Sequence, residues 1–340
     1  MRKCSIEALD AVLARLADTM PVYLPTDDEA GNANYKKWQE GVKLSDALNT
    51  VRSAKDFFFP QMEDLVEFKV DGKNIEVIDT RCESEDFVIF GVRGCDVKSF
   101  DVLDRVFLKE PVDSYYASRR AHAVIVSAAC ARPSETCFCK SFGIDATEPE
   151  GDVVTWKENG EMYFEAKTEK GNALMAKIED LTCECARDAV EAQKEKTAKI
   201  MAKLPLSDLP LDKFGSGKTK EYFDSEKWKE LSQTCLGCGT CTFVCPTCQC
   251  YDIKDFNTGK GVIRFRCWDS CMYSDFTKMS AGQPRLTQLE RFRQRFMHKL
   301  VYYPENNGGM FSCVGCGRCL AKCPVSTNIV KVMKSLGGDR

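Results

Sequence analysis

Histidine is nearly absent from this sequence, which has only two among its 340 residues, His122 and His298. Neither has a cysteine or carboxylate neighbourhood that resembles a nucleophilic triad, so each is expected to be a surface or core residue. The sequence also lacks a G-x-G-x-x-G fingerprint and gives no sign of dinucleotide binding in the Rossmann manner. We expect neither flavin nor NAD(P) to be bound by this chain alone, and we assign no catalytic residue.

Long apolar runs and a strong net charge are absent as well. No apolar stretch approaches the length needed to cross a bilayer, and the first 20 residues carry Asp10, Arg15 and Asp18 in place of an apolar signal core. The net charge of −3 does not suggest binding to nucleic acid or to an anionic membrane surface. We therefore expect a cytoplasmic protein that has neither a membrane nor a nucleic acid as partner.

Cysteine, in contrast, is abundant, with 20 residues. In a secreted protein so many cysteines would indicate disulfides, but the lack of an export signal favours reduced thiols that are available to bind metal. With 340 residues, of which 44% are hydrophobic, the chain is long enough for two domains with sizeable cores.

Two copies of one cysteine pattern lie in the C-terminal third of the chain. The first run extends from Cys235 to Pro246 and the second from Cys313 to Pro324, and both read C-x2-C-x2-C-x3-C-P. This is the bacterial ferredoxin run, which holds four-iron clusters. A zinc site is the alternative, but zinc sites typically use two CxxC pairs and no trailing Cys-Pro.

The spacing within each run predicts how its cysteines are shared. Two-residue gaps let one tight loop reach three corners of a cubane, and the fourth cysteine ligates the other cluster. We therefore predict two [4Fe–4S] clusters with crossed ligand sets. The first set is Cys235, Cys238, Cys241 and Cys323, and the second set is Cys313, Cys316, Cys319 and Cys245. Four neighbouring glycines lack a Cβ and are expected to let backbone amides approach the sulfur atoms: Gly237, Gly239, Gly315 and Gly317.

The residues before the ferredoxin runs read as a mixed α and β domain. Residues 87–92 and 123–127 are continuous apolar runs typical of buried strands, with a helix between them, which favours a small parallel core. Turn dipeptides at residues 71–72 and 159–160 predict two β-hairpins. We also expect helices around residues 44–54 and 172–202.

Composition divides the chain into two domains. Residues 205–221 carry prolines and glycines among charges and are expected to be a linker. The prediction is an α+β protein, in which a small α/β domain with hairpins (residues 1–204) precedes an α-helical, bacterial-type two-cluster ferredoxin domain (residues 222–340). That second domain contains an insertion between its two runs.

Four further cysteines follow the predicted strands of the N-terminal domain: Cys95, Cys130, Cys137 and Cys139. Sites in α/β sheets form where the carboxyl ends of strands meet loops, so these cysteines could hold a third cluster. The alternative is that they are buried thiols acting as small hydrophobic groups. Their number and their placement in predicted loops favour the cluster.

The remaining cysteines have weaker patterns. Four lie in the insertion between the runs: Cys248, Cys250, Cys267 and Cys271. They either bind metal together or pack around the first cluster and tune its potential, and we favour the second interpretation. Cys183 and Cys185 fall on a predicted helix, where a two-residue separation points them apart. Metal binding is therefore not expected there, nor at Cys4 and Cys82.

Residues 289–299 read as a basic helix. Such a helix can face a partner, or it can compensate the negative charge of a cluster and its thiolates. A solvated helix face is the simpler alternative, and the sequence leaves these possibilities open.

Several short motifs, together with the two runs, resemble a known family. They are Gly91-Val-Arg-Gly-Cys95-Asp96, Thr136-Cys-Phe-Cys139, Cys245-Pro-Thr-Cys248-Gln-Cys250 and Trp268-Asp-Ser-Cys271. From about residue 45 onward the chain resembles the iron–sulfur β subunit of cytoplasmic sulfhydrogenases. The corresponding iron–sulfur protein of anaerobic sulfite reductase and the dicluster subunits of flavin-linked reductase complexes are similar.

The resemblance implies a subunit that carries electrons between a flavin- and NAD(P)-binding partner and a catalytic subunit. That catalytic partner would be a NiFe hydrogenase, a sulfite reductase, a heterodisulfide-type reductase or a molybdenum or tungsten enzyme. The resemblance also supports a third [4Fe–4S] cluster near the four N-terminal cysteines.

Three functional classes fit these observations. An electron-transfer subunit is favoured, because the motifs supply clusters and no substrate pocket is evident. The alternative is a reductase subunit whose N-terminal domain binds a substrate or flavin and does chemistry at an open cluster. A redox sensor is disfavoured by the near-neutral charge and the lack of a basic recognition element.

Overall fold

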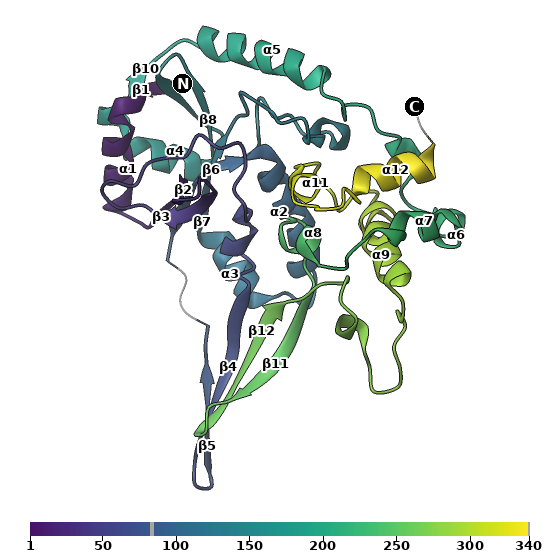
Figure 1. Cartoon of the computed structure of the whole chain (residues 1–340). Coiled ribbons are helices and arrows are strands. Elements are labelled where there is room, and N and C mark those ends of the chain that lie inside the picture. Colours follow the sequence, from purple (N-terminus) through teal and green to yellow (C-terminus); the bar gives the residue numbers. More distant parts are fainter. Residues whose placement is uncertain (82–84, 339–340) are drawn as a thin grey trace.

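Two β-sheets and a C-terminal group of helices form the fold (Figure 1). The structure is a computed structural model that describes residues 1–81 and 85–338. The larger sheet has eight strands in the order β10-β1-β9-β8-β7-β6-β2-β3. Their bounds are β1 (Arg2–Ser5), β2 (Val22–Asp27), β3 (Ala33–Lys37), β6 (Phe87–Arg93), β7 (Ala123–Ala128), β8 (Val153–Glu158), β9 (Glu161–Ala166) and β10 (Cys183–Glu184).

Parallel strands form the centre of this sheet. Each neighbouring pair in the series β2, β6, β7 and β8 is parallel. The two apolar runs of the sequence are β6 and β7, and helices α2 (Gly94–Phe107) and α3 (Ser114–His122) connect them. The predicted α/β core is therefore confirmed, and the carboxyl ends of its strands lie along one edge.

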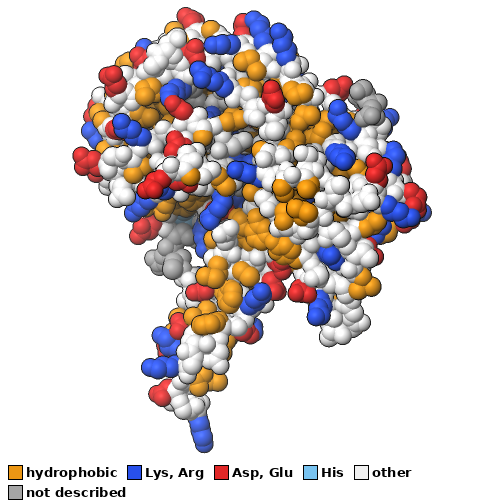
Figure 2. Space-filling view, in the orientation of Figure 1, with side chains coloured by type: hydrophobic (Ala, Val, Ile, Leu, Met, Phe, Trp, Pro, Cys, Tyr) orange, Lys and Arg blue, Asp and Glu red, His pale blue; other side chains and the backbone are white. Residues whose placement is uncertain are grey.

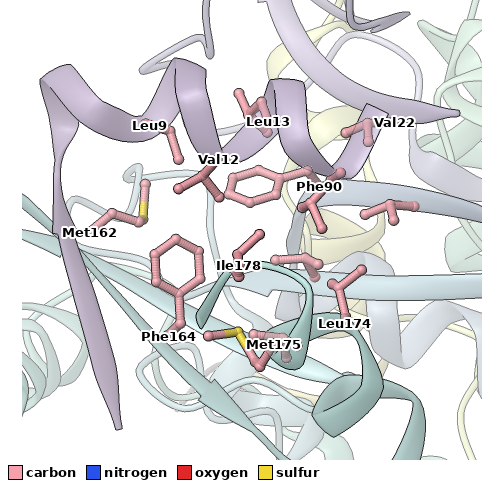
Figure 3. Close-up of a cluster of buried hydrophobic side chains, with 14 of the residues drawn as sticks. Leu9, Val12, Leu13, Val22, Phe90, Met162, Phe164, Leu174, Met175 and Ile178 are labelled. Atoms are coloured by element: carbon pink, nitrogen blue, oxygen red, sulfur yellow. The ribbon is translucent and has the colours of Figure 1, made fainter. Parts of the chain in front are cut away.

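Hydrophobic side chains cover both faces of the sheet. On one face α1 (Leu9–Ala17) and α4 (Glu169–Ala176) pack against the strands, and Leu13, Phe90 and Phe164 belong to the buried cluster drawn in Figure 3. On the other face Phe100 and other side chains of α2 pack against β6 and β7. Burial of each such side chain away from water stabilises the folded state by about 1.5–3 kcal/mol. This core fixes the positions of β6 and β7, the strands that precede Cys95 and Cys130.

The smaller sheet joins two segments that are far apart in the sequence. The hairpin of β4 (Met62–Asp71) and β5 (Asn74–Asp79) pairs with the hairpin of β11 (Tyr251–Asn257) and β12 (Gly261–Trp268), in the order β11-β12-β4-β5. The sheet projects from the body in Figure 1, and hydrophobic side chains are visible along it in Figure 2. The insertion between the ferredoxin runs is thus tied to the N-terminal domain.

Short helices surround the two ferredoxin runs. They are α6 (Thr219–Phe223), α7 (Lys227–Gln233), α8 (Thr240–Phe243), α9 (Gln288–Met297), α10 (Tyr303–Asn306), α11 (Arg318–Ala321) and α12 (Ile329–Gly337). A core that includes Trp228, Phe292 and Val332 holds these helices together. Within the described part of the chain, no helix combines the length and apolar character needed to cross a membrane.

The predictions for the N-terminal domain meet mixed outcomes. The α+β class is confirmed, and both predicted hairpins are present as β4–β5 and β8–β9. The helix expected at residues 44–54 is wrong. This segment is irregular, and the carbonyl groups of Ala47 and Leu48 accept hydrogen bonds from Arg93 instead of forming helical bonds.

The prediction of one continuous helix over residues 172–202 is wrong for the middle of this range. Helix α4 ends at Ala176, the short edge strand β10 then pairs with β1, and α5 (Asp188–Ala202) follows. Cys183 therefore lies on a strand. The linker at residues 205–221 stays a prediction, and Cys82 lies outside the described residues.

Candidate metal centres

A cavity gathers four of the predicted ligands at one place. Cys245, Cys313, Cys316 and Cys319 all line it. The last three belong to the second run, in the loop that leads into α11 and in α11 itself, whereas Cys245 follows α8 at the end of the first run. The structure thus brings together the second of the two crossed sets, although which atoms bind metal stays a prediction.

The other crossed set is assembled around the loop that precedes α8. Burial raises the pKa of the Cys241 thiol, and the nearby sulfurs of Cys235 and Cys238 raise it further. Cys323 comes from the second run, and its Sγ donates a hydrogen bond to the carbonyl oxygen of Thr327 at 3.6 Å. The Thr327 hydroxyl in turn lies 2.7 Å from that of Thr234, the residue before Cys235. These bonds tie the segment that carries Cys323 to the first run.

The four glycines beside the cysteines have positive φ angles: Gly237 (67°), Gly239 (73°), Gly315 (60°) and Gly317 (78°). At Gly315 the surroundings also exclude a side chain. A Cβ there would lie 2.5 Å from the backbone of Phe138, whose N–H donates to the Gly315 carbonyl at 2.9 Å. The N–H of Gly315 itself donates to the Cys313 sulfur. Gly315 thus permits both an approach to a sulfur and a contact with the Cys-Phe-Cys loop.

The four N-terminal cysteines lie at the carboxyl ends of β6 and β7 and in the loop beyond. Cys95 is in the first turn of α2, directly after β6, and Cys130 follows β7. Burial, together with the nearby sulfurs of Cys130 and Cys137, raises the pKa of Cys139 to about 12. Cys95 and Cys139 share a buried cluster with Cys316. The structure therefore brings these four cysteines together and places them beside the second set.

A buried ion pair joins the second run to helix α2. Arg318, next to Cys319, pairs with Asp96, next to Cys95, and the Nη2–Oδ2 distance is 2.7 Å. Arg318 is 5% exposed and Asp96 is 1% exposed. The same guanidinium donates to the carbonyl oxygen of Thr50 at 2.9 Å. This pair fixes the position of the N-terminal cysteines relative to the second run.

Two buried cations face the cavity of the second set. Arg295 is 2% exposed and Lys299 is 3% exposed, and both line the cavity. Neither forms an ion pair with a carboxylate in the described part of the chain, and Nε and Nη1 of Arg295 have no hydrogen-bond partner there. A buried charge is costly unless it is compensated. An anionic four-iron cluster would compensate these charges, so the site fits such a group.

The placement of two cations favours one of the possibilities for the basic helix. Arg295 lies on α9 and Lys299 in the π-helical turn that follows it. Lys299 Nζ donates to the Thr247 hydroxyl and to the Ser312 carbonyl oxygen, both at 2.8 Å. The nearby sulfurs raise the pKa of Lys299 despite its burial, so it stays charged. One face of this helix thus turns two cations towards the predicted ligands, where they would compensate the charge of thiolates.

The spacing of the thiols differs from that of a zinc site. Among residues 1–81 and 85–338, no three His, Cys, Asp or Glu side chains lie close enough to hold a single metal ion. A cubane binds one thiolate at each of four iron atoms, so its ligands lie further apart than those of one ion. The choice of a cluster over zinc rests on the two cysteine runs, which match the ferredoxin pattern.

Three of the four cysteines of the insertion pair with each other or with a predicted ligand. A hydrogen bond from Cys248 lowers the pKa of Cys245, and a hydrogen bond from Cys271 lowers the pKa of Cys250 to about 7. Cys248 therefore touches a predicted ligand of the second cluster, whereas we expected this group around the first. Cys267 lies on β12.

Lys55 is a buried residue that sequence reasoning missed. Its Nζ donates to the carbonyl oxygens of Cys245 and Cys248 at 3.1 and 2.9 Å and lies 3.6 Å from the ring centroid of Trp268. No local pattern marks this lysine, because its partners lie about 190 residues away in the chain. It holds the turn that carries Cys245 in place.

Comparisons with known proteins agree with this geometry. The family model described as "4Fe-4S dicluster domain" matches residues 234–327. "Sulfhydrogenase 2 subunit beta" of Pyrococcus furiosus is 35% identical over 295 residues, which cover 85% of this chain and 84% of the relative. The chain belongs to the sulfhydrogenase β-subunit family. No solved structure matches it significantly. The resemblance and the C-terminal dicluster domain inferred from the sequence are thus confirmed, and the chain is an iron–sulfur protein.

Proposed function

We propose that this chain is the electron-transfer subunit of a multisubunit oxidoreductase of the sulfhydrogenase type. One observation carries the proposal: a cavity in which thiols from both ferredoxin runs meet two buried cations that lack a carboxylate partner in the described part of the chain. The name of the relative, a β subunit, supports membership of a complex.

In this proposal the clusters take the ligands predicted from the sequence. Two [4Fe–4S] clusters use the crossed sets of the two runs, and a third uses the four N-terminal cysteines. Bound clusters supply one-electron transfer. The chain supplies the thiolates, the buried cations and a fixed spacing. Burial raises the pKa of Cys316 to about 12, so the free thiol carries its proton at neutral pH. Binding of iron to this sulfur would release that proton.

We further propose that the chain works in the cytoplasm between two partners. One is a flavin- and NAD(P)-binding subunit, and the other is a catalytic subunit of hydrogenase or reductase type. The resemblance to sulfhydrogenase and sulfite reductase subunits supports these partners. On this account the isolated chain does not sustain dye reduction by NAD(P)H.

A second candidate function is favoured by one observation. The N-terminal domain contains a cavity of about 600 Å³ beside the four N-terminal cysteines. The alternative is therefore a reductase subunit that binds a substrate or flavin in this cavity.

The iron content of paired variants tests the proposal. Replacing Cys238 by Ser should remove about four iron atoms per chain, the content of one cubane. Cys267→Ser is the matched control, because this cysteine lies on β12 and belongs to no predicted ligand set. Its iron content should equal that of the unaltered chain. Equal iron in both variants would contradict the ligand assignment.

A further inference from the structure

The larger cavity lies at the carboxyl ends of β6, β7 and β8. The irregular segment at residues 44–50 and one side of α5 complete its wall. Its volume of about 600 Å³ falls within the range of small-molecule sites. None of the residues that line it in the described chain is a cysteine. The cavity is therefore a compartment separate from the candidate metal centres.

The inner wall combines apolar side chains with a free phenol. Leu44 and Ile200 line it with accessible apolar surface, and Phe90 and Met162, which belong to the buried core, border it. Tyr35 also lines the cavity, and its hydroxyl has no hydrogen-bond partner among the described residues. Such a wall suits a ring system that also offers one polar group.

The rim of the cavity carries two unpaired positive charges. Arg132 and Lys196 are exposed, line the cavity and form no ion pair within residues 1–81 and 85–338. The third cation at the rim, Lys157, pairs with Asp46. Three carboxylates also line the cavity, and two of them are paired, Asp46 with Lys157 and Asp96 with Arg318. Two free cations against the single carboxylate of Glu158 favour an anionic group, such as a phosphate, in the ligand.

The cavity adjoins the N-terminal cysteines through two shared residues. Arg93 lines the cavity, and its guanidinium hydrogen-bonds the Cys130 sulfur and the Ala129 carbonyl oxygen, the latter at 2.9 Å. Asp96, which also lines the cavity, is the neighbour of Cys95. A ligand in the cavity is thus separated from the cysteines by a single layer of side chains.

We propose that this cavity binds a planar heterocycle with an anionic tail, of the flavin mononucleotide (FMN) class. The apolar wall would hold the ring, Tyr35 would hydrogen-bond a polar atom of it, and Arg132 and Lys196 would bind the phosphate. This inference deepens the second candidate function and replaces the sequence-based expectation that the chain binds no flavin. Exchange of electrons with the ligand rests on the proposed third cluster, but binding itself does not.

Titration of the anaerobically purified full chain with FMN tests the proposal, with quenching of flavin fluorescence as the readout. We expect one saturable site per chain. The double variant Arg132→Ala/Lys196→Ala should bind FMN about tenfold more weakly, because charge-assisted bonds to the phosphate are lost. Riboflavin, which lacks the phosphate, should bind the unaltered chain weakly, and the double substitution should leave that affinity unchanged. Lys199→Ala, on the same helix outside the cavity lining, is the control and should bind normally.

Several results would overturn the inference. They are the absence of saturable binding up to about 1 mM FMN, equal FMN affinities of the double variant and the control, and full displacement of FMN by an equal concentration of inorganic phosphate. Iron measured on the same samples separates this inference from the proposed function. Normal iron without FMN binding refutes only the ligand site, whereas FMN binding with iron missing from the N-terminal cysteines refutes only the third cluster.

Discussion

The backbone of Gly315 lies directly against that of Phe138. The Phe138 N–H donates to the Gly315 carbonyl oxygen at 2.9 Å, and a Cβ on Gly317, two residues along, would lie 2.6 Å from the Thr136 hydroxyl. The second ferredoxin run and the Cys-Phe-Cys loop are thus in contact through glycines. This contact places the N-terminal cysteines beside the second crossed set, as the proposed electron path between the clusters requires.

Replacing Gly315 by Ala should disrupt this contact. The positive φ angle alone costs about 1–2 kcal/mol, and overlap with the Phe138 backbone should add about 1–3 kcal/mol. Gly308→Ala is the matched control, because Gly308 also has positive φ (64°) but a Cβ added there would meet no atom within 4 Å. Thermal unfolding and iron content should show the larger loss for Gly315→Ala. Equal losses in the two variants would mean that the contact between Gly315 and Phe138 contributes nothing to stability or to iron binding.

Removing the charge of Lys299 should lower the midpoint potential of a cluster. A buried cation stabilises the more negative, reduced state, so Lys299→Met should shift the potential downward by on the order of 100 mV. EPR-monitored redox titration of the full chain measures this shift. Lys322→Met, an exposed change on the second run, should leave the potentials unaltered. An unchanged potential in Lys299→Met would show that no cluster lies near this lysine.

Burial, together with the charges of Lys299 and Arg285, lowers the pKa of His298 to about 4. In the unfolded chain a histidine has a pKa near 6.5, so below that pH the unfolded state binds a proton that the folded state does not. Stability is complete above about pH 6.5 and falls as the pH drops towards 4. We expect a loss of roughly 2 kcal/mol between pH 8 and pH 5.

Chemical denaturation at several pH values checks this expectation. His298→Gln should flatten the dependence in this window, whereas His122→Gln, at the exposed histidine that pairs with Asp86, should retain it. A pH dependence that persists in His298→Gln would assign the effect to other groups.

The Arg318–Asp96 pair offers a test of how the two cysteine groups are held together. Breaking a buried pair leaves one charge uncompensated and costs about 3–5 kcal/mol, so Arg318→Gln should be strongly destabilised. The pair of Arg264 and Asp255 is exposed on the projecting sheet, and Arg264→Gln should cost no more than about 1 kcal/mol. Thermal unfolding compares the two, and similar losses would argue against a structural role for the buried pair.

The sequence predicted features that depend on local spacing. The two ferredoxin runs, the hairpins and the strands that deliver Cys95 and Cys130 all follow from residue types only a few positions apart. The expected helix at residues 44–54 failed because Arg93, more than 40 residues away, takes up the carbonyl groups of that segment.

Features that depend on distant partners could not be predicted. Lys55 reaches the turn after Cys245, and the hairpin of β4 and β5 pairs with the insertion between the runs, so each depends on the complete fold. The basic helix was recognised, but only its packing shows that Arg295 and Lys299 point inward.

Iron and sulfide per chain, with low-temperature EPR of the reduced form, test the central claim of three clusters most directly. Anaerobically purified protein should contain about twelve iron atoms and show three interacting cubane signals. Cys139→Ser should reduce the content to about eight. A content of about eight in the unaltered chain would contradict the third cluster and confine electron transfer to the C-terminal domain.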